Sequence, residues 1–240
     1  MGPAPYVGTA AWNISKDHAG YFGQEGSHLQ RYAQVLNAVE INSSFYKEHQ
    51  AKSYVRWAND TPAEFRFSVK LSKVFTHESG LRPDEKKLLE SLDRICHLGE
   101  KFGVLLLQLP GKQNFEASAM EDFYRMLRRK ISIPIALEPR NLSWLCAESV
   151  RLMQEFAISK VQADPEKCLG EVKSKSHQTG VDYYRLHGSP LIYKSAYSEE
   201  YLQQLLVTLK SKKNPWCVFD NTTFGHATEN AVTLHRMWTR

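Results

Sequence analysis

Residues 38–46 read A-V-E-I-N-S-S-F-Y, and this stretch decides how the rest of the chain is interpreted. Val39 and Ile41 alternate with Glu40 and Asn42, the pattern of a short β-strand with one apolar and one polar face. Burying a polar side chain without a partner costs on the order of 2–7 kcal/mol. The polar face must therefore meet water or a polar site, and other strands show which of the two applies.

The composition is that of a folded globular chain. The 240 residues are 42% hydrophobic and carry a formal net charge of +5, which suits one α/β barrel and permits an anionic ligand without demanding one. No apolar run approaches the ~18 residues that span a membrane, and residues 1–8 lack the pattern of a secretory signal. The cysteines at positions 96, 146, 168 and 217 have no C-x-x-C spacing, which predicts reduced thiols in a cytoplasmic protein.

Predicted strands alternate with predicted helices along the chain. We expect strands at residues 6–12, 38–46, 66–73, 103–110, 134–140, 158–164, 182–188 and 216–221. We expect helices at residues 26–37, 53–59, 83–102, 116–130, 149–156, 198–213 and 227–239. This alternation predicts one α/β domain over residues 1–240, a (β/α)8 TIM-type barrel with an irregular or missing helix in the segment 165–181 after strand six. An open doubly wound sheet is disfavoured because G-x-G-x-x-G is absent.

The polar faces of the strands repeat the first pattern. If the apolar side of each strand faces the helices, the other side points into the barrel. The inward residues are then Glu40, Asn42, Ser68, Lys70, Leu106, Gln108, Ala136, Glu138, Arg140, Gln162, Asp164, Arg185, His187, Val218 and Asp220. The polar members lie toward the C-terminal ends of their strands, where barrel active sites are found, and therefore predict a polar pocket there.

Candidate site residues come from this set and from the loops that follow the strands. The candidate catalytic residues are Glu40, Glu138 and Asp220 as general acid or base and His187 as proton relay. The candidate substrate-binding residues are Asn42, Lys70, His77, Gln108, Arg140, Trp144, Arg185, Tyr193 and Asn221. Lys70, Arg140 and Arg185 would hold an anion such as phosphate or carboxylate.

The ordered motifs resemble a known family. They are V-G-T-A-A-W, V-E-I-N-S-S-F-Y, F-R-F-S-V-K with T-H, L-L-Q-L-P, A-L-E-P-R with W, Y-Y-R-L-H-G and F-D-N-T, and together they resemble the YecE-like family, domain of unknown function 72. The first motif departs from the family, which would read S-G-W where this chain reads A-A-W. The resemblance implies a TIM barrel and marks the motif positions as site residues, but it implies no reaction.

Three functions remain open from the sequence. The first is a hydrolase- or lyase-type enzyme that acts on a small anionic substrate by general acid/base chemistry, with no cofactor. In it Lys70 could form a Schiff base, although a salt bridge is the expected state.

The second is metal-assisted phosphoester hydrolysis with a divalent metal. Its possible ligands are Glu40, Glu138, Asp164, Asp220, His77 and His187, but neighbouring cations and the lack of H-E-x-x-H argue against it.

The third function is non-catalytic binding of an anion or of nucleic acid, by stacking bases on exposed aromatic side chains. The aromatic candidates are Trp12, Tyr46, Trp144, Tyr193 and Tyr197. We favour core or rim packing for these rings, and we expect no membrane partner. A purely structural salt-bridge network is also open, because the acids named above could be paired with Lys70, Arg140 and Arg185 without any ligand.

Overall fold

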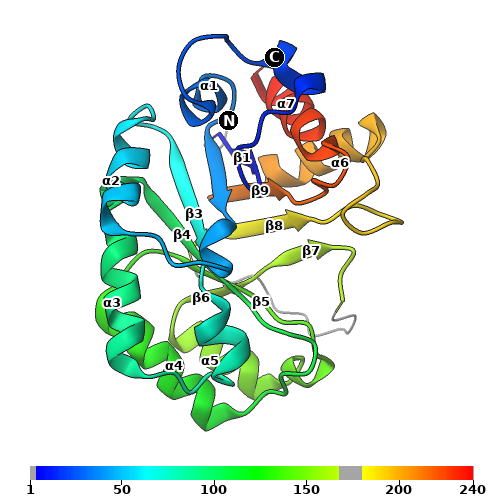
Figure 1. The fold of residues 1–240 in the computed structure, drawn as a ribbon. Helices are drawn as coiled ribbons and strands as arrows, with labels where there is room; N and C mark the ends of the chain where they lie inside the picture. The colour runs from blue at the N-terminus through cyan, green and yellow to red at the C-terminus, as the bar shows by residue number, and fades with distance from the viewer. Residues whose placement is uncertain (1–3, 168–179, 240) are drawn as a thin grey trace.

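Two parallel sheets organise the computed structural model, which describes residues 4–167 and 180–239 (Figure 1). The four-stranded sheet has the order β1 (Tyr6–Thr9), β9 (Pro215–Phe219), β8 (Asp182–Leu186), β7 (Gln162–Asp164). The five-stranded sheet has the order β2 (Ala38–Ile41), β3 (Arg66–Lys70), β4 (Phe102–Gln108), β5 (Ile135–Glu138), β6 (Ile158–Lys160). All these strand pairs are parallel, so the α/β prediction is confirmed.

Helices follow the strands as the sequence predicted. They are α1 (His28–Ala33), α2 (Ala51–Asn59), α3 (Glu85–Cys96), α4 (Ala117–Lys130), α5 (Ala147–Glu155), α6 (Glu199–Lys210) and α7 (His226–Thr239). Ser27 and Ser198 cap the starts of α1 and α6 through their side chains. The helix expected at residues 83–102 ends at Cys96 instead, and Gly99 adopts a φ of 59° just beyond it. Most of the segment predicted to be irregular, residues 168–179, lies outside the described residues.

The predicted closed barrel does not appear as one continuous ladder in the described part of the chain. At one seam, β1 and β2 are joined by the single bridge between Ala10 and Glu40. At the other, β6 pairs with β5 and β7 pairs with β8, so the two sheets share strand six end to end. A closed barrel would need this strand to pair on both sides along its length. The predicted parallel strands and helices are confirmed, but the ladders of the described residues form two sheets and do not show the predicted closed barrel.

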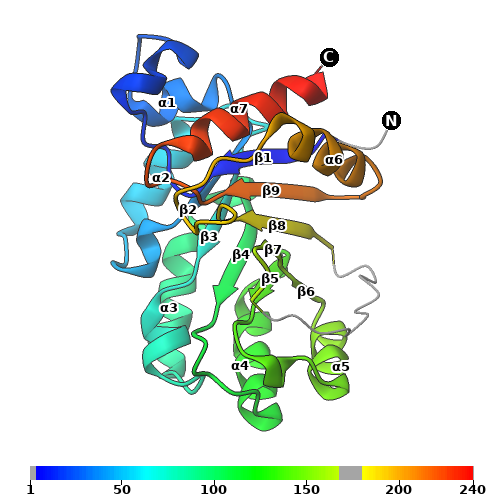
Figure 2. The same ribbon diagram turned by 90° about the vertical axis from the view of Figure 1, so that its right-hand side faces the viewer.

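The helices cover the outer faces of the two sheets. In Figure 2, α6 and α7 lie against the four-stranded sheet, and α3, α4 and α5 lie against the five-stranded sheet. A separate apolar cluster takes side chains from both sheets and therefore lies between them. Its members are Ala10, Ala38, Val104, Leu106, Ala136, Val161, Val181, Tyr183, Trp216 and Val218. The interior is thus packed with apolar side chains beneath the polar ends of the strands.

The inward assignment was wrong only at strand six. There Val161 is buried in the interior cluster, whereas Gln162 is exposed. Val161 belongs to neither β6 nor β7, and the strand changes partner at this residue. The change of partner puts Val161 and Ala163 toward the interior and leaves Asp164 outside the polar cluster described below.

The β1–β2 seam explains two residues of the first motif. A Cβ at Gly8 would lie 2.0 Å from the carbonyl oxygen of Ala38, so only glycine allows the strands to approach this closely. Ala11 has a φ of 96°, a region that side chains disfavour, and its N–H donates to the carbonyl of Glu40. The S-G-W pattern expected for the first motif has glycine at this position. The alanine therefore introduces local strain, on the order of 1 kcal/mol.

The described helices give no indication of a membrane span, since none combines sufficient length with sufficient apolar character to cross a bilayer.

Candidate active site

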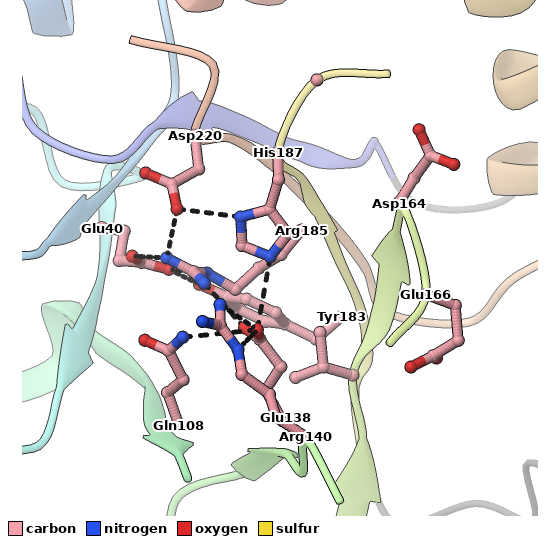
Figure 3. Close-up of polar contacts among 12 residues, drawn as sticks. Glu40, Gln108, Glu138, Arg140, Asp164, Glu166, Tyr183, Arg185, His187 and Asp220 are labelled. Carbon is pink, nitrogen blue, oxygen red and sulfur yellow. Dashed lines mark hydrogen bonds and ion pairs between the residues drawn. The ribbon is translucent and has the colours of Figure 1, made fainter. Parts of the chain in front are cut away.

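The ends of β2, β5, β8 and β9 meet around one guanidinium group (Figure 3). We call this group the Arg185 cluster, and its members are Arg185, Glu40, Glu138 and Asp220. Arg185 is fully buried, and its Nε and one terminal nitrogen donate to the two oxygens of Glu40 at 2.9 and 2.7 Å. The other terminal nitrogen donates to Glu138 at 2.6 Å. The terminal nitrogen that contacts Glu40 also donates to Asp220 at 3.0 Å. One cation thus joins three carboxylates from both sheets.

Tyr183 links the Arg185 cluster to Ser68 by hydrogen bonds. The Tyr183 hydroxyl lies 3.0 Å from Glu40 Oε2 and 2.7 Å from Ser68 Oγ. Burial and the neighbouring Glu40 raise the pKa of Tyr183 well above its ordinary value, so it remains a neutral hydrogen-bonding group. The sequence prediction did not select Tyr183. The available signal was its place two residues before Arg185, on the same face of the strand.

His187 lies two residues after Arg185 and contacts two of the carboxylates. Its Nδ1 is 3.0 Å from Asp220 Oδ2, and its Nε2 is 3.3 Å from Glu138 Oε1. Nε2 is buried but makes no well-formed hydrogen bond. Burial lowers the pKa of His187, but Asp220 and Glu138 outweigh burial and raise the pKa above its ordinary value. The ring is therefore held between Asp220 and Glu138.

Lys70 is the last residue of β3 and differs from the other cations. It is 6% exposed, and its Nζ lies 4.2 Å from the centroid of the Phe45 ring. Among the described residues, Nζ forms no ion pair or hydrogen bond. The expectation that Lys70 forms a salt bridge was therefore wrong. The carboxylates it would need are engaged by Arg185. Burial and the repulsion of Arg185 lower the pKa of Lys70 to about 8, although the three carboxylates act in the opposite direction.

Arg140 and Gln108 complete the contacts of Glu138. Arg140 reaches Glu138 Oε1 with Nε at 2.8 Å and a terminal nitrogen at 2.7 Å, and Gln108 Nε2 lies 3.5 Å from the same oxygen. Burial raises the pKa of Glu138, but Arg185, His187 and Arg140 together hold it well below its ordinary value. The side chain of Arg140 is 16% exposed, so it combines an internal partner with an open side.

Three other predicted residues lie near these groups. His77 packs edge-on against the same Phe45 ring at 4.9 Å, and burial together with Lys70 lowers its pKa. The ring of Tyr193 is 5.7 Å from that of His187. Asn42 follows β2, and its buried Oδ1 has no hydrogen-bond partner. These residues extend the polar site toward the loops.

Trp144 and Asn221 have structural partners instead. The buried Trp144 indole donates to the carbonyl of Gln113, which holds two loops together. Asn221 donates from Nδ2 to the Ser195 carbonyl and to Asn230 Oδ1, which ties the loop after β8 to α7. Within the described part of the chain, neither side chain forms a hydrogen bond with the Arg185 cluster.

One further expectation was wrong on position. The carboxylate of Asp164, counted with the inward acids, points away from the cluster in Figure 3. Tyr197 and Trp144 are both buried, which confirms the favoured prediction of packing for these two rings and leaves neither exposed for stacking on a nucleobase. In the described part of the chain, no three or more His, Cys, Asp or Glu side chains are grouped as a ligand set for a metal ion. Of the carboxylates proposed as metal ligands, Glu40, Glu138 and Asp220 are paired with Arg185.

Comparison with known proteins shows which family and which relatives the chain is similar to. A family model described as protein of unknown function DUF72 matches residues 6–240. The UPF0759 protein YecE of Escherichia coli strain K12 is 30% identical over 105 residues, which cover 44% of this chain and 37% of that protein. The UPF0759 protein YunF of Bacillus subtilis is 29% identical over 150 residues, or 58% of this chain and 51% of that protein. The chain therefore aligns with about half or less of these curated relatives.

Solved structures show where the fold recurs. A DUF72 family protein from Thermotoga maritima has a TM-score of 0.76 and 22% identity, with 98% of this chain and 99% of that chain covered. The enzyme YcjR of E. coli, described as 3-keto-D-glucoside 4-epimerase, has a TM-score of 0.56 and 10% identity, with 99% of this chain and 100% of that chain covered. At these identities the likeness is one of fold.

Proposed function

Because this chain belongs to DUF72, a family of proteins of unknown function, we propose an activity from the site itself: general acid/base catalysis on a small anionic substrate. The substrate would carry a phosphate or carboxylate and would bind at the C-terminal ends of the strands. We infer for the chain a TIM-type barrel architecture whose ladder is interrupted at two seams. We further propose that this enzyme works in the cytoplasm without a cofactor.

The geometry of His187 carries the proposal. Asp220 lies 3.0 Å from one ring nitrogen, and Glu138 lies 3.3 Å from the other, buried nitrogen without a well-formed hydrogen bond. A histidine whose two ring nitrogens face carboxylates, and whose pKa these carboxylates raise, is suited to general acid/base catalysis.

The charge balance supports an anionic substrate. The carboxylates of Glu40, Glu138 and Asp220 are matched in number by three permanent or titratable cations, Arg185, Arg140 and Lys70. Protonation of His187 adds one positive charge to this set, and its pKa is raised. Arg140 has an open side, and Lys70 has no carboxylate partner among the described residues, so both have donors for an incoming anion.

A small ligand is preferred to nucleic acid for two reasons. Burial of Trp144 and Tyr197 removes two of the aromatic side chains that stacking would use. YcjR, which shares the fold, is described as an epimerase of a glucoside, and this is a precedent for chemistry on small sugars in such a scaffold. The precedent concerns the fold, since identity is only 10%. Metal-assisted phosphoester hydrolysis is the second candidate that an assay should include.

Binding of inorganic phosphate tests the anion site. Calorimetric titration at pH 6 should show one phosphate bound per chain, with weaker binding at alkaline pH once His187 has lost its proton. Arg140→Ala should weaken binding at least tenfold, whereas Arg82→Ala, which removes an exposed pair with Glu116, should leave it unchanged. Absence of binding in the wild type, or equal effects of the two variants, contradicts the anion site.

Catalysis is tested by proton exchange. A panel of ketose phosphates and keto acids is incubated in D2O, with a phosphomonoester assayed in parallel with and without Mg²⁺. We expect deuterium incorporation at carbon, reduced at least 100-fold by His187→Asn while circular dichroism remains native. A turnover that is strictly metal-dependent favours the second candidate. Strongly salt-dependent binding of single-stranded DNA, with no turnover, would favour a nucleic-acid binding protein.

A further inference from the structure

We propose that Lys70 is a catalytic residue of this site and forms an imine with an aldehyde or ketone carbon of the substrate. The inference rests on the proposed function and names its substrate class: a small carbonyl compound that carries a phosphate or carboxylate. The observation behind it is a buried lysine at the end of a strand, next to a cluster whose carboxylates already have other partners.

The position of Lys70 is unusual for a lysine. Lysine side chains are almost never buried unless an acid pairs with them. Lys73, three residues later, shows the ordinary arrangement: its side chain is 43% exposed and pairs with Glu78 at 3.0 Å. Lys70 is 6% exposed, and its Nζ lies 4.2 Å from the centroid of the Phe45 ring. Burial of this kind has a cost, and an essential amine at a binding site is a reason to retain it.

The surroundings favour the neutral amine, which is the nucleophile. Burial and the nearby Arg185 disfavour a proton on Lys70, and together they outweigh the three carboxylates, which act in the opposite direction. With a pKa of about 8, roughly a tenth of Lys70 is unprotonated at pH 7, against well under a thousandth for a lysine in water. Desolvation next to another cationic group is a recognised way to activate a lysine for attack on a carbonyl.

The neighbouring groups supply the remaining requirements of the reaction. Arg140 is available to hold the anionic group of the substrate, and Phe45 and His77 form an aromatic wall beside the amine. His187 is available for proton transfer. The proposed site therefore combines an amine, an anion-binding cation and an acid/base on three different strand ends, as rigid positioning requires.

The covalent step balances without any further reactant. The neutral Nζ attacks the carbonyl carbon, a C–N bond forms, and the carbonyl electron pair moves to oxygen, which takes up a proton. The resulting carbinolamine loses its hydroxyl group as water, and the C=N bond forms. From the ammonium form, the sum is ammonium plus carbonyl giving protonated imine plus water, with no oxidation or reduction.

Reductive methylation with formaldehyde tests the amine directly, because formaldehyde is the smallest carbonyl probe and needs no specific recognition. The folded wild-type protein is treated with formaldehyde and cyanoborohydride between pH 6.5 and 9, and each lysine is quantified by peptide mass spectrometry. We expect Lys70 to be methylated at least fivefold faster than Lys73 at pH 7. A Lys70 that remains unmodified while Lys73 reacts overturns the proposal.

A second probe tests the substrate class. Glycolaldehyde phosphate with borohydride should give one reduced adduct at Lys70, which disappears in Lys70→Arg and persists in Lys73→Arg. Inorganic phosphate should compete with it. Labelling that is spread over exposed lysines and unchanged in Lys70→Arg contradicts the imine. If phosphate still binds and depends on Arg140 in that case, the acid/base proposal survives without the imine, so the two failures are distinguishable.

Discussion

Arg185 and Lys70 are both buried cations at the same ends of the strands, but their surroundings are opposite. Arg185 donates to three carboxylates, and this pairing raises its pKa well above the ordinary value. Lys70 has no such partner among the described residues, and its pKa falls to about 8. The planar guanidinium suits several simultaneous acceptors, whereas an amine can be kept partly neutral. We infer that Arg185 stabilises the site and that Lys70 reacts in it.

Removing Arg185 should have the largest effect. Arg185→Met removes the cationic partner of Glu40 and one partner each of Glu138 and Asp220, so we expect a loss of about 3–5 kcal/mol in the free energy of unfolding, or failure to fold. Urea denaturation measures this loss, and Arg185→Lys should fall between wild type and Arg185→Met. The control Arg82→Met breaks an exposed pair and should cost less than about 1 kcal/mol. A loss of stability no larger than that of the control would contradict the stabilising role of Arg185.

Removing Lys70 should have the opposite sign. The pKa of about 8, against 10.5 for a free lysine, means that protonated Lys70 costs about 3 kcal/mol in the folded state at neutral pH. Lys70→Met should therefore stabilise the protein at pH 7 by up to about 3 kcal/mol while reducing activity. Because the folded state binds this proton less tightly, wild-type stability regains the difference as pH rises from about 8 to 10.5. Urea titrations at pH 7 and pH 10 measure the change in the gain.

Lys73→Met is the matched control for this experiment, and we expect a change within ±0.5 kcal/mol because the side chain is exposed. Destabilisation by Lys70→Met at pH 7 would show that the carboxylates hold Lys70 as a structural partner. It would contradict the assigned difference between Lys70 and Arg185.

His187 should give the smallest effect, seen in pH dependence. Its pKa is raised in the folded state, so its contribution is complete below the unfolded pKa of about 6.5 and is lost as pH rises through the folded value. His187→Asn should remove this loss of stability on the alkaline side. Burial lowers the pKa of His235, so His235→Asn should instead reduce the loss of stability at acid pH. Thermal unfolding from pH 5 to 8.5 distinguishes the two; identical profiles would contradict the assigned direction for His187.

Alternation was sufficient to predict most of the site. In strands flanked by helices, the helix-facing residues must be apolar, so the opposite residues Glu40, Glu138 and Arg185 could be assigned to the interior. The same rule failed at residues 158–164, I-S-K-V-Q-A-D, because both faces contain apolar and polar residues and the strand changes partner at Val161. A local pattern does not encode such a change of partner.

Pairing was less predictable than position. The sequence indicated that Lys70 would lie near carboxylates, but not that Arg185 would occupy all three, because competition between cations depends on distances of an ångström or less. Trp144 was misjudged for a similar reason: its hydrogen bond to Gln113 joins two loops, and no local period reports a contact between loops.

The pairing of β1 with β9 bears on how the protein is made. Among the described strands, β1 has a hydrogen-bonded ladder only with β9, so it waits without this ladder until β9 has left the ribosome. The strands β2 to β6 can assemble earlier, since each pairs with its neighbour in sequence. Glu40 and Glu138 would then remain hydrated in this nascent half until β8 delivers Arg185, and translation rate over the second half would set how long that surface stays open.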